Sequence, residues 1–180
     1  KNFEFIDIID FRKINRIDKK ISKFHINDLF LFKENLYVSF FSISGNYNNK
    51  KFVQDGGVIS INLKNYKVTR CMKNLQKPHS PVIHEGKLFV LDSSSGKLLD
   101  NNMNVLGEFN GFIRGLDFSE KFFIISQSED MYSSLNFNKA RRGPTSCNSG
   151  IIIFDQENNL VRFYPTTSIM NIHHIKVLDV

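Results

Sequence analysis

Apolar positions along the chain fall into short runs that are separated by polar turns. Residues 29–32 and 36–42 flank the turn Lys33-Glu-Asn35, and the same outline returns at residues 82–91 and 116–126. Short runs rich in Ile, Val, Leu and Phe on either side of such a turn are typical of β-hairpins. The pattern therefore predicts three hairpins at regular intervals.

A second hairpin follows each of the first three. Residues 57–70, 96–109 and 150–164 each open on Gly, continue as a short extended run, turn on Asn, Asp or Lys, and return. Two consecutive hairpins make a four-stranded antiparallel meander, and meanders in series indicate the blades of a β-propeller. We therefore expect an all-β fold with complete blades at about 25–71, 79–109 and 114–165. An open β-sandwich is the alternative.

The two ends of the sequence predict partial elements. Residues 174–178 resemble the first strand of a fourth blade, and residues 3–9 resemble the outer strand of a preceding one. Apolar positions spaced by three and four within residues 10–24 predict a short helix or a wrapped connector. The predicted organisation is thus an outer strand and connector at 1–24, followed by blades at 25–180.

Three complete blades are too few to close a ring, because propellers typically have 4–8 blades. We therefore expect an incomplete ring. The rest of a longer chain or a second copy would complete it, or the head and tail would close a small ring.

Composition agrees with this fold and narrows the classes of function. The chain has one Ala against 20 Ile, 20 Asn and 18 Phe, which disfavours a helical bundle and favours strands and turns. No apolar run approaches the roughly 20 residues of a membrane helix. Cys71 and Cys147 are far apart and form no CxxC motif, which predicts ordinary thiols in a reducing, cytoplasmic environment rather than a zinc site.

The net charge is +6, and its basic residues are densest between positions 12 and 23. A nucleic-acid site is one interpretation of this segment. A solvated basic face is favoured, because Asp10 and Asp18 interrupt the run and no interleaved aromatic residues offer a base-stacking surface. Nucleotide-binding glycine motifs and the GxSxG nucleophile motif are absent, so enzyme status stays open.

Polar residues recur where each predicted blade begins. In a propeller these entries share a face with the loops between the second and third strands, and the long loop 128–149 carries two arginines. The expected ligand-binding residues are His25, Asn27, Asp28, His79, Ser80, Arg114, His174, Arg141 and Arg142.

Three interpretations of this face remain open. His25, His79 and His174 could converge on a zinc, iron or copper ion. Arg114 could instead clamp an anion, with Arg141 and Arg142 closing over it. Each His could also simply satisfy backbone groups around the channel. We expect a small-molecule or peptide ligand at this face, with metal assistance as one version, and a non-catalytic protein-interaction scaffold as the alternative.

Several segments in this order resemble a known family. They are His25-Ile-Asn27, Pro78-His-Ser-Pro81, residues 84–92, residues 111–116, residues 150–155 and residues 175–178. The chain resembles, over about residues 24–179, a bacterial family of conserved hypothetical proteins with a domain of unknown function, some fused to tetratricopeptide repeats. The resemblance implies a propeller of which this chain is the carboxyl-terminal half, and it implies importance for His25, Asn27, His79 and Arg114.

The sequence departs from that family at three positions. Val82 stands where Arg is usual after Pro-His-Ser-Pro, Asp28 stands where Gly is usual, and His174 stands where Asp is usual. The loss of Arg at position 82 weakens an anion site. The resemblance therefore implies no particular reaction for this chain.

Overall fold

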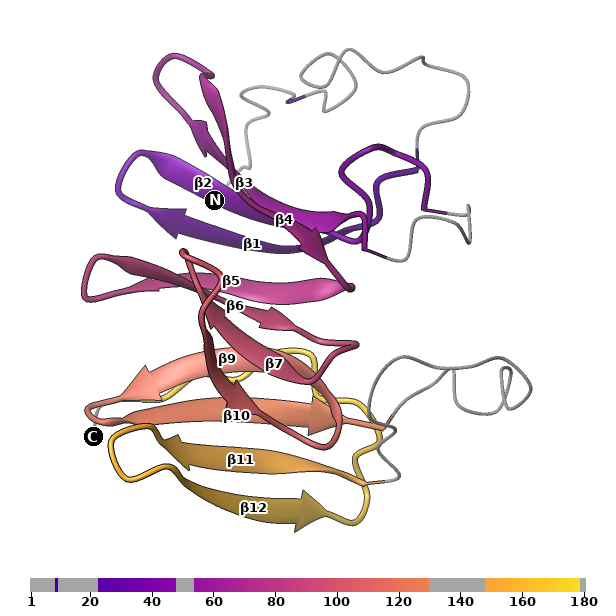
Figure 1. Cartoon of the computed structure of the whole chain (residues 1–180), viewed down its shortest axis with the longest axis vertical. Helices are drawn as coiled ribbons and strands as arrows, with labels where there is room; N and C mark the ends of the chain where they lie inside the picture. Colours follow the sequence, from indigo (N-terminus) through magenta and orange to yellow (C-terminus); the bar gives the residue numbers. More distant parts are fainter. Residues whose placement is uncertain (1–8, 10–22, 48–53, 130–147, 179–180) are drawn as a thin grey trace, which may run out of the picture.

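The computed structural model describes residue 9 and residues 23–47, 54–129 and 148–178. Within these ranges the protein is all-β and contains no helix (Figure 1). Twelve strands form three four-stranded antiparallel sheets, each in the order in which its strands occur along the chain. This confirms the predicted meander blades.

The strand bounds are as follows. Blade 1 contains β1 (Ile26–Phe32), β2 (Asn35–Phe40), β3 (Gly56–Asn62) and β4 (Val68–Leu75). Blade 2 contains β5 (Pro78–His84), β6 (Lys87–Asp92), β7 (Lys97–Asp100) and β8 (Val105–Glu108). Blade 3 contains β9 (Phe112–Ser119), β10 (Phe122–Ser128), β11 (Ser149–Asp155) and β12 (Leu160–Thr166).

The first strand of each blade begins earlier than the run of apolar positions that predicted it. The runs start at 29, 82 and 116, whereas the strands start at Ile26, Pro78 and Phe112. Each first strand contains a β-bulge, where two residues face one residue of the second strand. Pairing resumes beyond the bulge, so the strand extends into the polar entry segment.

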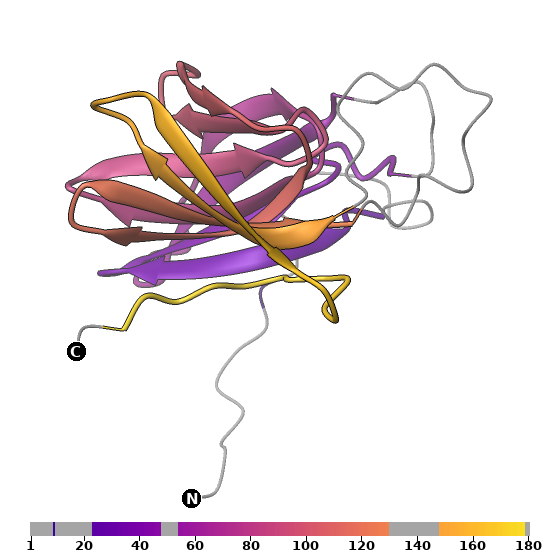
Figure 2. The same cartoon turned by 90° about the horizontal axis from the view of Figure 1, so that it is seen from below.

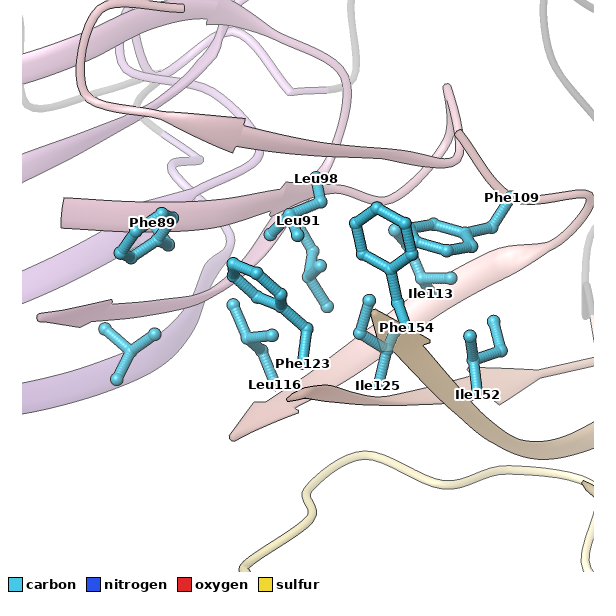
Figure 3. Packing of buried hydrophobic residues seen from close by; sticks show 11 residues of the cluster. Phe89, Leu91, Leu98, Phe109, Ile113, Leu116, Phe123, Ile125, Ile152 and Phe154 are labelled. Carbon is cyan, nitrogen blue, oxygen red and sulfur yellow. The ribbon is translucent and has the colours of Figure 1, made fainter. Parts of the chain in front are cut away.

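The blades pack face to face in chain order, with the inner strands β1, β5 and β9 next to one another (Figures 1 and 2). Val58, Met72 and Leu75 of blade 1 pack against Leu88, Val90 and Leu99 of blade 2. The larger core lies between blades 2 and 3, where Phe89 packs against Phe123 at a ring-centroid distance of 5.5 Å (Figure 3). These two cores fix the positions of the inner strands.

The predicted first strand of a fourth blade does not form. Residues 167–178 run as an irregular segment, which we call the tail, and it follows blade 3. Side chains of blade 3 hold it: the Ile172 amide donates to Ser128 Oγ at 2.9 Å, and the Val177 amide donates to Asp117 Oδ2 at 2.7 Å. The Glu129 amide also donates to the Met170 carbonyl at 2.9 Å, so the tail lies against blade 3 through these side chains and one backbone hydrogen bond instead of a strand ladder.

The ring is not closed by the residues that the structure describes, which form three sheets and no fourth. The predicted helix at 10–24 and outer strand at 3–9 lie almost wholly outside those residues. In the part of the chain that is described, no helix is long and apolar enough to cross a membrane.

Candidate functional site

Hairpin register identifies one equivalent polar position in each blade. The first strands end at Phe32, His84 and Ser119, which pair with the first residues of the second strands. The residue five positions before each of these ends is Asn27, His79 or Arg114. The three blades thus place an amide, an imidazole and a guanidinium at the same point of the repeat.

This register corrects the expected alignment of the histidines. His25 lies two residues before Asn27 and outside β1, so it is not equivalent to His79. Its backbone is in the left-handed region, with φ of 49°, and its side chain is exposed. The sequence pattern missed this offset because His25 and Asn27 both lie at the entry to the blade.

The residue that follows each of these positions lies in the bulge. Its backbone amide therefore has no partner in the strand ladder. The Asp28 amide donates to Ser39 Oγ at 3.1 Å, and the Gly115 amide donates to Ser126 Oγ at 2.7 Å. In blade 2 the Ser80 amide donates instead to Asp28 Oδ2 of blade 1, at 2.8 Å. Side chains therefore satisfy all three bulge amides, as buried donors require.

Ser80 links all three inner strands. Its amide binds Asp28, and its hydroxyl donates to the Arg114 carbonyl at 2.6 Å. Its φ of 48° is in the left-handed region, which costs a non-glycine residue roughly 1–2 kcal/mol. The two hydrogen bonds hold this strained backbone in place, and they engage the hydroxyl in a structural contact.

His79 is buried and uncharged. Its Nδ1 lies 3.0 Å from the Lys77 carbonyl oxygen and 2.7 Å from Ser93 Oγ. Because the carbonyl can only accept, Nδ1 carries the proton. Burial and then the neighbouring Arg114 charge lower the pKa of His79 to about 3, so the ring is neutral at physiological pH.

Arg114 brings a buried positive charge to the junction, with 5% of its surface exposed. Its guanidinium carbon lies 5.0 Å from the centre of the Phe112 ring, which is a cation–π contact. One terminal nitrogen, Nη1, lies 2.8 Å from Nε2 of His173 in the tail. Burial and Arg114 lower the pKa of His173, so a neutral imidazole accepts this hydrogen bond.

Asp28 supplies the negative charge of the same cluster. Burial raises the pKa of its carboxyl group, while the hydrogen bond from the Ser80 amide and the nearby Arg114 charge oppose that rise. The cluster formed by Asp28, His79, Ser80, Arg114 and His173 is named the junction site. It brings together four of the nine expected ligand-binding residues and adds His173, which was not among them.

Aromatic rings form a row beside the junction site. The His25 ring stacks on Phe41 at a centroid distance of 4.2 Å, and Phe41 contacts His79 edge to face at 5.3 Å. His79 in turn contacts Phe112 at 5.6 Å. Phe41 and Phe112 were not among the expected site residues, because nothing distinguishes them from the other phenylalanines of a Phe-rich chain.

The described residues do not form the expected three-histidine metal site. No group of three His, Cys, Asp or Glu side chains in that part of the chain could hold a metal ion. The ring of Phe41 contacts both His25 and His79, which places an apolar group between them. Arg141 and Arg142, expected to close over a ligand, lie outside the described residues.

A separate recess lies at the edge of blade 1, next to Asp55, Arg70 and Lys73. Asp55 accepts hydrogen bonds from the Ser44 amide at 3.3 Å and from Ser44 Oγ at 2.5 Å. Its carboxylate thereby fixes the segment after β2. The recess does not share residues with the junction site.

Comparison with known proteins gives a family but no activity. No curated protein matches the chain. A model for a domain of unknown function, DUF4915, matches residues 13–180, which includes all three blades and the whole junction site. The chain therefore belongs to this family of unknown function.

Proposed function

We propose that the chain binds a small organic anion at the junction site, and that Arg114 recognises its carboxylate group. The observation that carries this proposal is the environment of Arg114. Its guanidinium is almost wholly buried, yet the group at its Nη1 is the exposed His173 of an irregular segment. Moving this exposed imidazole would make Nη1 of the buried guanidinium accessible to a ligand.

The chemistry of the cluster suits a carboxylate. A guanidinium presents paired N–H donors that match the two oxygens of a carboxylate. The contact with Phe112 lowers the local dielectric and strengthens such an ion pair. His79 and His173 are neutral and can donate or accept hydrogen bonds without adding charge.

The row of rings beside Arg114 supports a ligand with a flat apolar part. His25 is exposed and Tyr47 is half-buried, and their rings lie 4.6 Å apart. An aromatic acid would place its carboxylate at Arg114 and its ring toward this row. No metal is part of the proposal, and no reaction is assigned.

Thermal shift and calorimetry with acetate, benzoate, glutamate and inorganic phosphate at constant ionic strength test the proposal. A ligand at about ten times its Kd stabilises the folded state by about 1.4 kcal/mol. We expect benzoate to raise Tm most. Arg114→Lys keeps the charge but loses the paired donors, and we expect it to remove the response.

The matched control is Arg70→Lys, an exposed arginine on β4 away from the junction site. It should respond to benzoate as the wild type does. Absence of any carboxylate response, an unchanged response in Arg114→Lys, or a response to phosphate alone would each overturn the proposal. In the first case the interaction-scaffold alternative is favoured.

A further inference from the structure

Asp28 carries a charge that its hydrogen bond within the fold does not require. Its Oδ2 accepts the Ser80 amide at 2.8 Å. The equivalent amides of blades 1 and 3 are accepted by neutral hydroxyl groups, those of Ser39 and Ser126. Blade 2 has Leu91 at the position of these serines, so its bulge amide needs an acceptor from another blade. A neutral side chain at position 28 would be sufficient for that purpose.

The carboxylate of Asp28 lacks a cationic partner within the described part of the chain. It is half-buried, and burial raises its pKa because water solvates the charge incompletely. Among the described residues it forms no ion pair, and its hydrogen bond is the one to Oδ2. Asp117, on β9, is different: it pairs with Lys176 at 2.9 Å and accepts the Val177 amide. Poorly solvated carboxylates are stabilised by a cation, so the junction site suits a positively charged group of a ligand.

The buried positive charge of the site lies close to this carboxylate. One residue, Ser80, joins the two: its amide binds Asp28, and its hydroxyl donates to the Arg114 carbonyl at 2.6 Å. The Arg114 charge is also near enough to oppose the rise in the pKa of Asp28. Asp28 and Arg114 form no ion pair with each other, so the junction site offers a carboxylate and a guanidinium to one ligand.

Positive charge lies at the His25 end of the row of rings. Burial and then the charge of Lys77 lower the pKa of His25. A cationic group of a ligand is therefore disfavoured at that end and favoured at Asp28. The rings of Tyr47 and His25, 4.6 Å apart, suit an uncharged aromatic group.

We propose that the ligand of the junction site is an α-amino acid with an aromatic side chain, and that Asp28 binds its ammonium group. The inference rests on the proposed function, because Arg114 still binds the carboxylate. An α-amino acid carries both charges on one carbon atom, which matches an acid and a base that are joined through Ser80. Asp28 then has two roles: it holds the Ser80 amide and it selects a ligand with an amine.

Calorimetry of the full chain with three related compounds tests the inference. They are L-phenylalanine, 3-phenylpropionate, which lacks only the ammonium group, and phenethylamine, which lacks only the carboxylate. We expect phenylalanine to bind at least about tenfold more tightly than 3-phenylpropionate, because it adds a hydrogen bond between two charged groups. Phenethylamine should bind more weakly than phenylalanine, since it offers nothing to Arg114.

Two variants locate the ammonium group. Asp28→Asn keeps a carbonyl oxygen for the Ser80 amide but removes the charge, and it should abolish the preference for phenylalanine over 3-phenylpropionate. Circular dichroism and the Tm without ligand check that this variant folds. Glu34→Gln is the matched control: it removes the same charge from an exposed residue at the other end of the β1–β2 hairpin, and it should keep the preference.

The outcomes separate this inference from the proposed function. Equal affinity of the wild type for phenylalanine and 3-phenylpropionate would overturn the inference and leave the proposed function in place. A preference that survives in Asp28→Asn, or that is also lost in Glu34→Gln, would overturn the role of Asp28 in the same way. If neither acid binds, or if phenethylamine binds as tightly as phenylalanine, the proposed function fails and the inference fails with it.

Discussion

Blades 1 and 3 have the same inner hairpin but different neighbours. Both have the bulge in the same register, and both place a serine, Ser39 or Ser126, opposite it to accept the displaced amide. In blade 1 both bulge residues bind blade 2. The Asn27 side-chain amide donates to the Pro78 carbonyl, and the Asp28 carboxylate accepts a hydrogen bond from the Ser80 amide. In blade 3 the bulge residue Arg114 meets the tail. The repeat fixes the backbone, and the neighbouring element decides what the side chains do.

A glycine marks this difference. Position 28 of blade 1 carries an aspartate that reaches across to Ser80. The equivalent residue of blade 3 is Gly115, where an added Cβ would lie 2.8 Å from the Ile175 amide nitrogen and 3.0 Å from the His174 carbonyl carbon. The missing side chain is what lets the tail approach β9, and thereby brings His173 to Arg114.

The largest effect is expected from a comparison of two isoleucines, which lie on the third strands of blades 1 and 3. Ile61 is 0% exposed on the face of blade 1 that points away from blade 2, whereas Ile153 is half-buried on the face of blade 3 that points away from blade 2. We expect Ile61→Ala to lower the free energy of unfolding by about 3–4 kcal/mol and Ile153→Ala by about 1 kcal/mol or less. Urea titration at low protein concentration measures both. Equal losses would show that the two faces are not differently covered.

The next test uses the buried imidazole of blade 2, at the position that Asn27 and Arg114 occupy in blades 1 and 3. The pKa of His79 is about 3 in the folded protein, against about 6.5 when unfolded. Between these values the unfolded state binds the additional proton, so stability decreases as pH falls from 6.5 toward 3. At pH 4.5 this group costs about 2–3 kcal/mol relative to neutral pH.

His79→Asn places the residue of blade 1 at this position and should remove that part of the acid sensitivity. Free energies of unfolding at pH 7 and pH 4.5 for both proteins give the difference. The carboxylates are common to both, so their contribution cancels. Parallel pH profiles for the two proteins would show that His79 is protonated normally when folded.

A smaller effect is expected from the serines that accept the bulge amides. Ser39→Ala and Ser126→Ala each leave a bulge amide without its acceptor, which costs about 1–3 kcal/mol. Ser126 also donates to the Ile172 carbonyl at 3.0 Å, so its loss should be the greater and should increase amide hydrogen exchange in the tail. Ser39→Ala should leave exchange in the tail unchanged. A larger loss of unfolding free energy from Ser39→Ala than from Ser126→Ala would contradict the assignment of both contacts to Ser126.

The smallest effect is expected on the exposed edge of blade 3. Leu160→Lys places a charge on a residue that is 62% exposed, and we expect the free energy of unfolding to change by less than about 0.5 kcal/mol. A thermal melt at low protein concentration measures it. A loss above about 2 kcal/mol would mean that this edge is covered in the monomer.

Local signals were sufficient for the hairpins but not for the site geometry. Turns such as Lys33–Asn35 and runs such as 36–42 located the strands, because alternation and turn residues act over a few positions. The sequence also suggested that Asn27, His79 and Arg114 share one face, and the hairpin register places them at one point of the repeat. It mistook His25 for an equivalent of His79, because an entry residue with positive φ leaves no signal in the pattern.

The amino-acid sequence by itself determined the number of complete blades, their strand order and the polar character of the blade entries, since these follow from local alternation and from turn chemistry. The tertiary structure decided which side chains meet. It put a phenyl ring between two histidines and left a predicted strand as an irregular segment held by Ser128 and Asp117. It also buried Val38 and Ile61 at one end of the row of blades and left Ile151 and Ile153 half-buried at the other. These outcomes depend on contacts between residues far apart in the chain, which no local pattern encodes.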